Sequence, residues 1–205
     1  MEFSEFSTLL PRRALWVFGY GSLMWSPGFR PLARKAVLIH GYHRSLCVLS
    51  TLHRGSPERP GLVLGLRRGG SCWGMALRID PTGAIPALRE LWDREMAYSV
   101  YQPRVLAART KGGTTLAAIA FVADPQHPQY VGGLGIARMA RAVAHSRGGR
   151  GANIDYLGQT LAHMRRLGVR DPHLELVLLE ATRLESGDPR QAGSNPAPSR
   201  AMPRV

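Results

Sequence analysis

Cysteine is scarce in this chain of 205 residues, which has only Cys47 and Cys72 and neither a Cys-x-x-Cys pair nor a Cys/His cluster. A disulfide framework or a structural zinc site needs more ligands at closer spacing, so the sequence predicts neither. His40 and His43 form a His-x-x-His pair, but they lie in a stretch typical of a strand, where side chains three residues apart point to opposite faces. We therefore expect no metal site.

Long hydrophobic runs are also missing. No run approaches the roughly 18 apolar residues that a transmembrane helix needs. Residues 1–5 carry acid where a secretory signal peptide would carry base. Both absences predict a cytoplasmic protein without a membrane partner.

Lysine and acidic residues are few. Only Lys35 and Lys111 among the 27 basic residues are lysines, and the 14 acidic residues leave a net charge of +13. The arginines are scattered along the chain, which is typical of a composition bias in the source genome and of a solvated basic surface. The positive field of such a surface would attract an anionic substrate.

The length and composition fit one ordinary domain. A chain of 205 residues with 44% hydrophobic content can bury one full-sized core. We expect a flexible N-terminal extension at residues 1–13, a single domain at 14–185 and a disordered C-terminal tail at 186–205. In that tail, glycine, proline and serine take the place of apolar bulk.

Periodicity predicts a strand-rich front and a helical rear. Strands are expected at residues 15–18, 36–49, 62–66, 72–79, 104–108 and 114–123, with hairpin connections at 67–71 and 109–113. Helices are expected at 84–96, 136–146, 153–167 and 172–184, with Asn153 and Asp171 as N-caps and Gly168 as the terminating glycine. Gly41 interrupts the longest strand and predicts a bend or bulge.

The first strand ends abruptly at Gly19-Tyr20-Gly21. Because glycine has no Cβ, a ligand oxygen can approach the backbone N–H groups closely, and consecutive N–H groups in a turn can form an anion-binding concavity. The same pattern is typical of a strand-to-turn corner that binds nothing, so both interpretations stay open here.

Better-known glycine loops do not match this stretch. Met24 stands where a dinucleotide fingerprint needs its third glycine, and no Gly-Lys-Ser/Thr follows as in a P-loop. Tyr20 and Met24 also occupy the positions where a nucleophile elbow needs glycine on either side of Ser22. We therefore interpret Ser22 as a hydroxyl donor and not as a nucleophile.

The helix expected at 84–96 carries a carboxylate on its apolar stripe. The stripe comprises Ile85, Leu88, Leu91, Trp92 and Met96. Glu95 falls in the middle of it, where desolvation raises the pKa of a carboxyl, and a raised pKa suits a general acid/base near neutrality. The alternative is a carboxylate that pairs with an arginine at the fraying helix end. Tyr98 and Tyr101 follow and would crowd hydroxyl groups around the same place.

Two polar loops each allow a functional and a plain interpretation. Arg54 stands beside Gly55 and suits a bidentate clamp for a substrate carboxylate, but the segment 53–61 also fits a solvated connection. Two prolines force the segment 124–130 into an extended loop, which is either a lid or a connection.

Five motifs in register resemble the ChaC family, the glutathione-specific γ-glutamylcyclotransferases. They are Val-Phe-Gly-Tyr-Gly-Ser-Leu-Met-Trp at 17–25, His-Arg-Gly at 53–55 with Pro-Gly at 60–61, Cys-Trp-Gly-Met-Ala at 72–76, Trp-Asp-Arg-Glu-Met at 92–96 and Asn-Ile-Asp-Tyr-Leu at 153–157. The resemblance covers residues 15–184. It implies an α+β fold, a small and partly closed mixed β-barrel with helices packed outside.

The resemblance also implies a reaction and a site. Glutathione would be cleaved into 5-oxoproline and cysteinylglycine without a metal or cofactor, with the catalytic domain at 14–185. Glu95 falls on the position of the general acid/base, and Arg54 and Tyr101 match as substrate contacts. The loop that holds the γ-glutamyl group would comprise Val17, Phe18, Gly19, Tyr20, Gly21, Ser22 and Leu23. Residues 131–134 depart from the family pattern, so the resemblance does not imply that this segment contributes to a lid.

The chemistry of the residues agrees with this reaction. The α-amine of the γ-glutamyl group is protonated at neutral pH, and Glu95 as base would take its proton and return it to the departing nitrogen. Backbone N–H groups near residues 19–22 would stabilise a substrate carboxylate or the oxygen that becomes negative. The nucleophile belongs to the substrate, so no protein serine or cysteine has to attack.

Two other functions remain open at this level. One is the same fold acting on another γ-glutamyl amine. The other is a basic β-barrel that binds RNA or single-stranded DNA, with stacking platforms at Tyr20, Trp25, Tyr42 and Trp73. The favoured prediction is a small-molecule substrate, glutathione, with no nucleic-acid partner and a chain for which a monomer is plausible.

Overall fold

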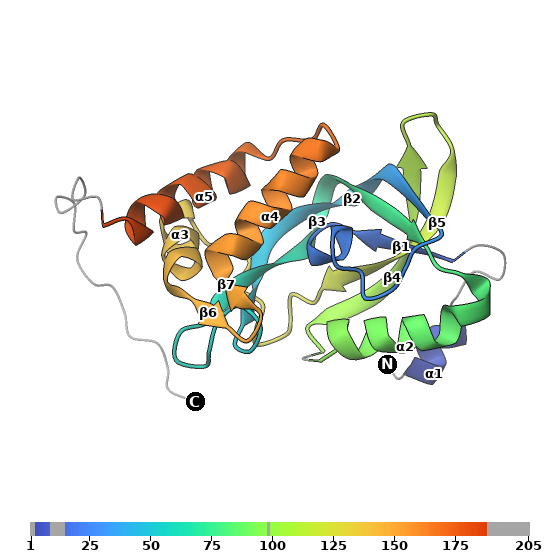
Figure 1. The fold of residues 1–205 in the computed structure, drawn as a ribbon, viewed down its shortest axis with the longest axis horizontal. Coiled ribbons are helices and arrows are strands. Elements are labelled where there is room, and N and C mark those ends of the chain that lie inside the picture. Colours follow the sequence, from blue (N-terminus) through green and yellow to red (C-terminus); the bar gives the residue numbers. More distant parts are fainter. Residues whose placement is uncertain (1–2, 9–14, 98, 188–205) are drawn as a thin grey trace.

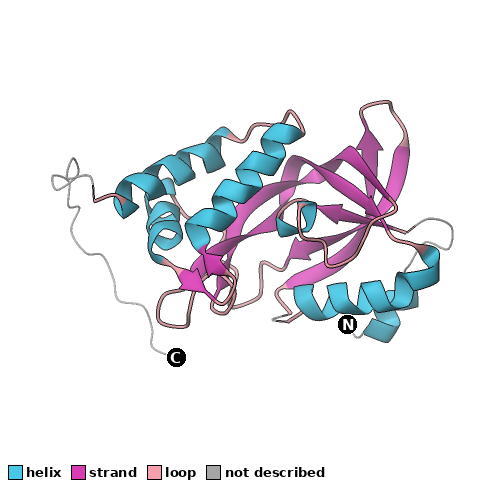
Figure 2. Cartoon of the chain, in the orientation of Figure 1, coloured by secondary structure: helices cyan, strands magenta, loops and turns pink. Residues whose placement is uncertain are grey.

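The computed structural model describes residues 3–8, 15–97 and 99–187 of the chain (Figure 1). Five strands close into a mixed barrel, and helices cover it from outside (Figure 2). The strands are β1 (Trp16–Gly19), β2 (Ala33–Ser50), β3 (Gly61–Arg78), β4 (Tyr101–Thr110) and β5 (Thr115–Ala123). The expected barrel with outer helices is confirmed.

The short strand β1 closes the barrel. It pairs antiparallel with β3 and parallel with β5, and all four of its residues are buried. A strand covered on both faces is expected to be apolar throughout, which is the pattern of this segment. The glycine turn that follows β1 is therefore held at the rim of a rigid sheet.

The long strands β2 and β3 pair along their whole length, and both bend at glycines. The register shifts between His40 and Tyr42, and Gly41, Gly69 and Gly70 all have positive φ. The predicted hairpin across residues 67–71 is therefore wrong, because these residues continue β3 through a bulge. The glycines allow the bulge, and β2 supplies a pairing partner on both sides of it.

The second hairpin, from β4 to β5, is confirmed. Thr110 donates its N–H to the Thr114 carbonyl across the turn, and Gly113 takes the positive φ that the turn requires. β4 begins earlier than expected, at Tyr101, which places this tyrosine at the strand end beside α2.

Helix α2 (Ala84–Glu95) packs on the barrel through Leu88, Leu91 and Trp92. The predicted stripe is confirmed for these residues and wrong for Ile85 in the first turn of α2, which is 56% exposed. Residues 1–13 were expected to be irregular, and this is wrong for α1 (Phe3–Thr8). Its Phe3 and Phe6 are buried against Trp92, with ring centroids 5.9 and 5.0 Å from it.

The rest of the expected extension, residues 1–2 and 9–13, lies outside the described residues, as do Tyr98 and residues 188–205 of the expected tail. No described helix has the length and apolar character that crossing a membrane would need.

Three helices form a layer on the other side of the barrel (Figure 1): α3 (Ile136–His145), α4 (Asn153–Arg166) and α5 (Pro172–Glu185). The terminating role of Gly168 is confirmed by its φ of +70°, and the Asp171 cap by the 3.1 Å bond from the Leu174 N–H. A two-stranded ribbon of β6 (Arg147–Gly148) and β7 (Gly151–Ala152) separates α3 from α4.

The expected N-cap role of Asn153 is wrong. Asn153 is the first residue of α4, and its buried amide bonds the backbone of Leu62 in both directions, with Oδ1 2.6 Å from the Leu62 nitrogen and Nδ2 2.8 Å from the Leu62 oxygen. The amide thereby extends the β3 hydrogen-bond ladder to the start of α4, which fixes this helix against the barrel.

Candidate active site

A cavity of about 110 Å³ opens at the rim of the barrel where the glycine turn, the C-terminus of α2 and the start of β4 meet. Its lining includes these predicted site residues: Tyr20, Gly21, Ser22, Leu23, Arg54, Glu95 and Tyr101. Val17, Phe18 and Gly19 are not part of the lining, because they belong to β1, whose residues are all buried in the sheet. The predicted loop thus divides into a buried half and a half that faces the cavity.

The half of the loop that faces the cavity leads into a single helical turn, η1 (Ser22–Met24). Met24 donates its N–H to the Gly21 carbonyl at 2.9 Å, whereas the first N–H groups of any helix have no partner within the helix. A Cβ on Gly21 would lie 3.1 Å from the Tyr156 hydroxyl, a tight contact that a larger residue could make only if this hydroxyl moved. The turn therefore presents backbone donors beside a hydroxyl group.

Glu95, the last residue of α2, is the carboxylate of this cavity. Its side chain is 16% exposed and its Oε1 lies 3.2 Å from Arg94 Nε. Burial raises the pKa of Glu95, although the Arg94 and Arg150 guanidinium groups act in the opposite direction. The sequence allowed two interpretations of Glu95, a carboxyl with a raised pKa and a carboxylate paired with an arginine. The structure shows features of both, because Glu95 pairs with Arg94 and still has a raised pKa.

Arg94 connects this carboxylate to the glycine turn. Its Nη2 donates to Ser22 Oγ at 2.7 Å while its Nε faces Glu95. The arginine therefore fixes the position of the Ser22 hydroxyl relative to the Glu95 carboxylate. Ser22 Oγ thus accepts a hydrogen bond on the cavity wall, and the interpretation that it is not a nucleophile stays a prediction.

Three tyrosines lie around Glu95: Tyr20 and Tyr156 are buried, and Tyr101 is partly buried. Tyr20 donates its hydroxyl to the Phe121 carbonyl at 2.7 Å, and Tyr101 donates to the Leu64 carbonyl at 2.9 Å. Burial raises the pKa of both phenols well above the ordinary range. Their rings and neutral hydroxyls thus form a rigid wall, and neither can serve as a base at neutral pH.

Tyr156 on α4 differs from the other two. Its hydroxyl accepts the Leu64 N–H at 3.2 Å, and burial raises its pKa to about 12. No acceptor for its hydroxyl proton is found in the part of the chain that the structure describes, so this proton is available to a ligand. Tyr156 belongs to the fifth motif, but the sequence predicted no role for it. Its position three residues after Asn153 puts both residues on one helix face, and this spacing was the signal that could have predicted a role.

Arg54 lies at the mouth of the cavity. Its guanidinium carbon is 5.3 Å from the Tyr156 ring centroid, and its Nη1 donates to the Ala152 carbonyl at 3.3 Å. The polar loop that carries it is held by the β6–β7 ribbon, because Gly149 and Arg150 donate their N–H groups to the carbonyls of Leu52 and His53. The loop connects the paired strands β2 and β3 and several of its residues are exposed, so the interpretation as a hairpin connection is not contradicted and the role of Arg54 as a clamp stays a prediction.

The same ribbon brings Arg150 to the cavity, a residue that sequence reasoning missed because its glycine-rich surroundings indicated only a break between helices. Arg54, Arg94 and Arg150 outnumber the single carboxylate Glu95 among the lining residues. Burial and the three neighbouring arginines lower the pKa of His53, which keeps it uncharged at neutral pH. The excess of positive charge therefore favours an anionic ligand.

The structure also bears on the other predicted roles. Tyr20, a predicted stacking platform for nucleic-acid bases, is 6% exposed, so that expectation is wrong for this residue. Among the described ranges, no three His, Cys, Asp or Glu side chains lie close enough together to hold a metal ion.

Comparison with known proteins places this geometry in a family. The sequence model of the ChaC-like proteins matches residues 15–183. The chain is 34% identical to the glutathione-specific γ-glutamylcyclotransferase of Escherichia coli K12 over 170 residues, which cover 83% of this chain and 74% of that protein. It is 33% identical to the human glutathione-specific γ-glutamylcyclotransferase 1 over 172 residues, covering 81% of this chain and 78% of that one.

Solved structures agree on the fold. A yeast γ-glutamyl cyclotransferase specific to glutathione superposes with a TM-score of 0.79 over 86% of this chain and 99% of that one, at 20% identity. Because the family model spans nearly the whole described chain, and relatives above 30% identity cover more than two thirds of it, this protein belongs to the ChaC-like family.

Proposed function

We propose that this protein is a γ-glutamylcyclotransferase that cleaves glutathione into 5-oxoproline and L-cysteinylglycine, with Glu95 as its general acid/base. The observation that carries the proposal is the buried Glu95 carboxylate, which lines one cavity together with the glycine turn and an excess of arginines. The names of the bacterial and human relatives support the substrate. The catalytic unit is residues 14–185.

The reaction balances without a cofactor. The α-amino nitrogen of the γ-glutamyl group bonds to its own γ-carbonyl carbon, and the amide bond to the cysteinyl nitrogen breaks. The substrate ammonium has two protons more than the ring nitrogen of 5-oxoproline, and both end on the cysteinyl nitrogen, which becomes an ammonium. The protein therefore has to move protons between two nitrogens of one substrate.

Glu95 is suited to this transfer. A carboxylate whose pKa is raised by burial accepts a proton from the ammonium more readily than an exposed one, and it returns the proton more readily than a stronger base would. Arg94 holds one carboxylate oxygen at 3.2 Å, which leaves the other oxygen for the substrate.

The glycine turn supports the step in which charge develops. Attack converts the γ-carbonyl oxygen into an oxyanion, and hydrogen-bond donors placed in advance lower the energy of that state. The N–H groups of Gly21 and Ser22 and the hydroxyl of Tyr156 are the donors that line this wall. Tyr20 and Tyr101 are already bonded to backbone carbonyls and act as the wall itself.

The arginines at the mouth suit the two carboxylates of glutathione. We assign Arg54, which is held against Tyr156, and Arg150 to these groups, since guanidinium forms strong charge-assisted bonds to carboxylate. A cytoplasmic location would place the protein within the glutathione pool that keeps the cytosol reducing.

The direct test incubates the purified protein with millimolar glutathione and measures 5-oxoproline and cysteinylglycine. The wild type is expected to form both in equal amounts. Glu90→Gln is the matched control for Glu95→Gln, because Glu90 is an exposed carboxylate of the same helix. Absence of product from a folded wild type would overturn glutathione as substrate, and a panel of other γ-glutamyl amines would then identify the one that is cyclised.

The assignment of Arg150 has its own test with glutathione and its glycine ethyl ester, which lacks one carboxylate. With Arg150 assigned to the glycine carboxylate, Arg150→Gln is expected to raise the KM for glutathione about two- to fivefold, the scale of a partly exposed charge pair, and to leave the KM for the ester unchanged. Arg147→Gln, on the same ribbon but outside the cavity lining, is the control. Equal changes for both substrates would contradict the assignment.

A further inference from the structure

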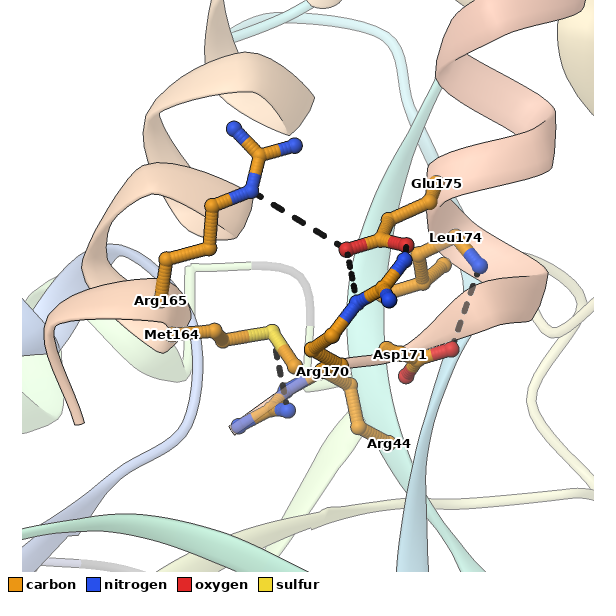
Figure 3. A network of polar contacts seen from close by, with 7 residues as sticks. All are labelled: Arg44, Met164, Arg165, Arg170, Asp171, Leu174 and Glu175. Atoms are coloured by element: carbon orange, nitrogen blue, oxygen red, sulfur yellow. Dashed lines mark hydrogen bonds and ion pairs between the residues drawn. The ribbon is translucent and has the colours of Figure 1, made fainter. Parts of the chain in front are cut away.

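Arg44, in the middle of β2, is a buried cation. It is 8% exposed and its guanidinium spans three acceptors: Nε donates to the Tyr20 carbonyl at 2.7 Å, Nη2 to the Trp73 carbonyl at 2.6 Å and Nη1 to Met164 Sδ at 3.0 Å. Figure 3 shows this guanidinium beside Met164 of α4. It thus joins the glycine turn, β3 and the helical layer.

The energetics of Arg44 are unusual for a structural residue. Among the described residues, no carboxylate lies within ion-pair distance of it, and Glu175 pairs with Arg165 and Arg170 instead (Figure 3). A buried charge without a counter-ion is costly, and an apolar side chain of the same size often gives more stability. We therefore look for the reason for this buried arginine in the backbone groups that its guanidinium holds in place.

What it holds is a peptide plane of the glycine turn. No peptide bond in the described ranges is cis, so the Tyr20 carbonyl and the Gly21 N–H point in opposite directions. Since Arg44 binds that carbonyl, the Gly21 N–H points away from Arg44. No backbone acceptor for this N–H is found in the described part of the chain, and Gly21 lines the cavity with Glu95.

We propose that Arg44 is a positioning residue: by holding the Tyr20 carbonyl, it aims the Gly21 N–H at the γ-carbonyl oxygen of the substrate as that oxygen becomes negative. The inference rests on the proposed cyclotransferase function. Arg44 touches no substrate and acts only through this peptide plane. Its planar fork is essential, because one guanidinium reaches both the Tyr20 and the Trp73 carbonyl, whereas a single lysine ammonium cannot match that geometry.

The test compares kcat and KM of Arg44→Lys and Arg44→Ala with those of the wild type. Loss of one oxyanion donor lowers kcat by about 10²- to 10³-fold, so a misdirected donor is expected to lower kcat at least about tenfold. The KM for glutathione is expected to stay within about threefold, because the interaction is made in the transition state. The acid limb of the pH profile is expected to stay in place, because Glu95 is untouched.

Chemical rescue separates positioning from general stability. Arg44 also lines a second cavity, of about 500 Å³, between the barrel and the helical layer, which gives a small cation a route to the vacated site. Millimolar guanidinium is expected to restore kcat of Arg44→Ala, and methylammonium is not. Arg34→Lys is the matched control, since Arg34 Nη1 donates to the Met24 carbonyl of the same turn, away from the cavity; its kcat is expected to change less than twofold.

Wild-type kcat in a folded Arg44→Lys or Arg44→Ala would overturn the proposal, as would a loss that guanidinium does not restore. Failure of the proposed function is a separate result, seen as no 5-oxoproline from the wild type. In that case, the positioning role is tested by the hydrogen-exchange rate of the Gly21 amide. A changed rate in Arg44→Lys and an unchanged rate in Arg34→Lys supports the role, and an unchanged rate in both variants overturns it.

Discussion

Glu95 and Glu175 are two glutamates with almost the same exposed fraction, 16% and 18% of the side chain, and both lie beside arginine. Burial raises the pKa of Glu95, whereas the hydrogen bond from Arg170 lowers the pKa of Glu175, with help from Arg165. The same residue type with the same local partner thus behaves in opposite ways.

Their surroundings explain the difference. Glu175 lies in the first turn of α5, where the helix dipole favours an anion, and two arginines from α4 and its following loop converge on it (Figure 3). Glu95 ends α2, lines the cavity together with three tyrosines and has one direct arginine partner. Glu175, whose charge is balanced by two arginines, stabilises the contact between α4 and α5. Glu95, whose charge is balanced less completely, can accept a proton.

The largest expected difference between the two glutamates is in turnover. Glu95→Gln is expected to lower the kcat for glutathione cleavage about 10²-fold or more, the scale for losing a general acid/base, while the fold stays intact. Glu175→Gln is expected to change kcat less than twofold. Product formation and circular dichroism measure both. Comparable turnover in a folded Glu95→Gln would end the proposed role of Glu95.

The next effect is on pH dependence. Activity is expected to fall about tenfold per pH unit below the pKa of Glu95, which lies above the ordinary glutamate value. Because Arg94 lowers this pKa, Arg94→Gln is expected to shift the acid limb of the kcat profile to higher pH. An acid limb that stays in place, or moves to lower pH, would contradict the assignment of the limb to Glu95.

A smaller effect concerns stability. A carboxyl whose pKa is raised on folding opposes folding at pH values above that raised pKa, and the cost disappears as the pH falls to the ordinary value near 4.5. Glu95→Gln is therefore expected to raise the unfolding midpoint at neutral pH by about 1–4 °C, and the gain should vanish at acid pH. Thermal unfolding followed across this range checks both parts; a lowered midpoint at neutral pH would contradict them.

The smallest effect is the contribution of Glu175 to stability, which has the opposite sign to that of Glu95. The pKa of Glu175 is lowered on folding, so its ion pairs stabilise the fold above the ordinary glutamate pKa, and the stabilisation is lost as the pH falls through the lowered value. Glu175→Gln is expected to lower the unfolding midpoint slightly at neutral pH and not at acid pH. Added salt should reduce the difference, because exposed charges are screened.

Much of the fold was predictable from local sequence. The apolar run of β1, the β4–β5 hairpin and the buried face of α2 follow from periodicity, because each element buries one defined set of side chains. The hairpin expected at 67–71 was wrong because glycines allow a turn and a bulge equally well. Only the neighbouring strand β2, more than twenty residues away, decided between them.

The candidate site shows the same division. The sequence alone determined that Glu95 sits on an apolar stripe and that a glycine turn follows the first strand, since both depend on residues close together in the chain. Tertiary structure alone decided that Arg150 and Tyr156 line the same cavity as that turn and that Arg44 binds the Tyr20 carbonyl, because these contacts join segments at least 24 residues apart in the chain. The surroundings that raise the pKa of Glu95 and lower that of Glu175 are likewise made by the packed molecule and are absent from the local sequence.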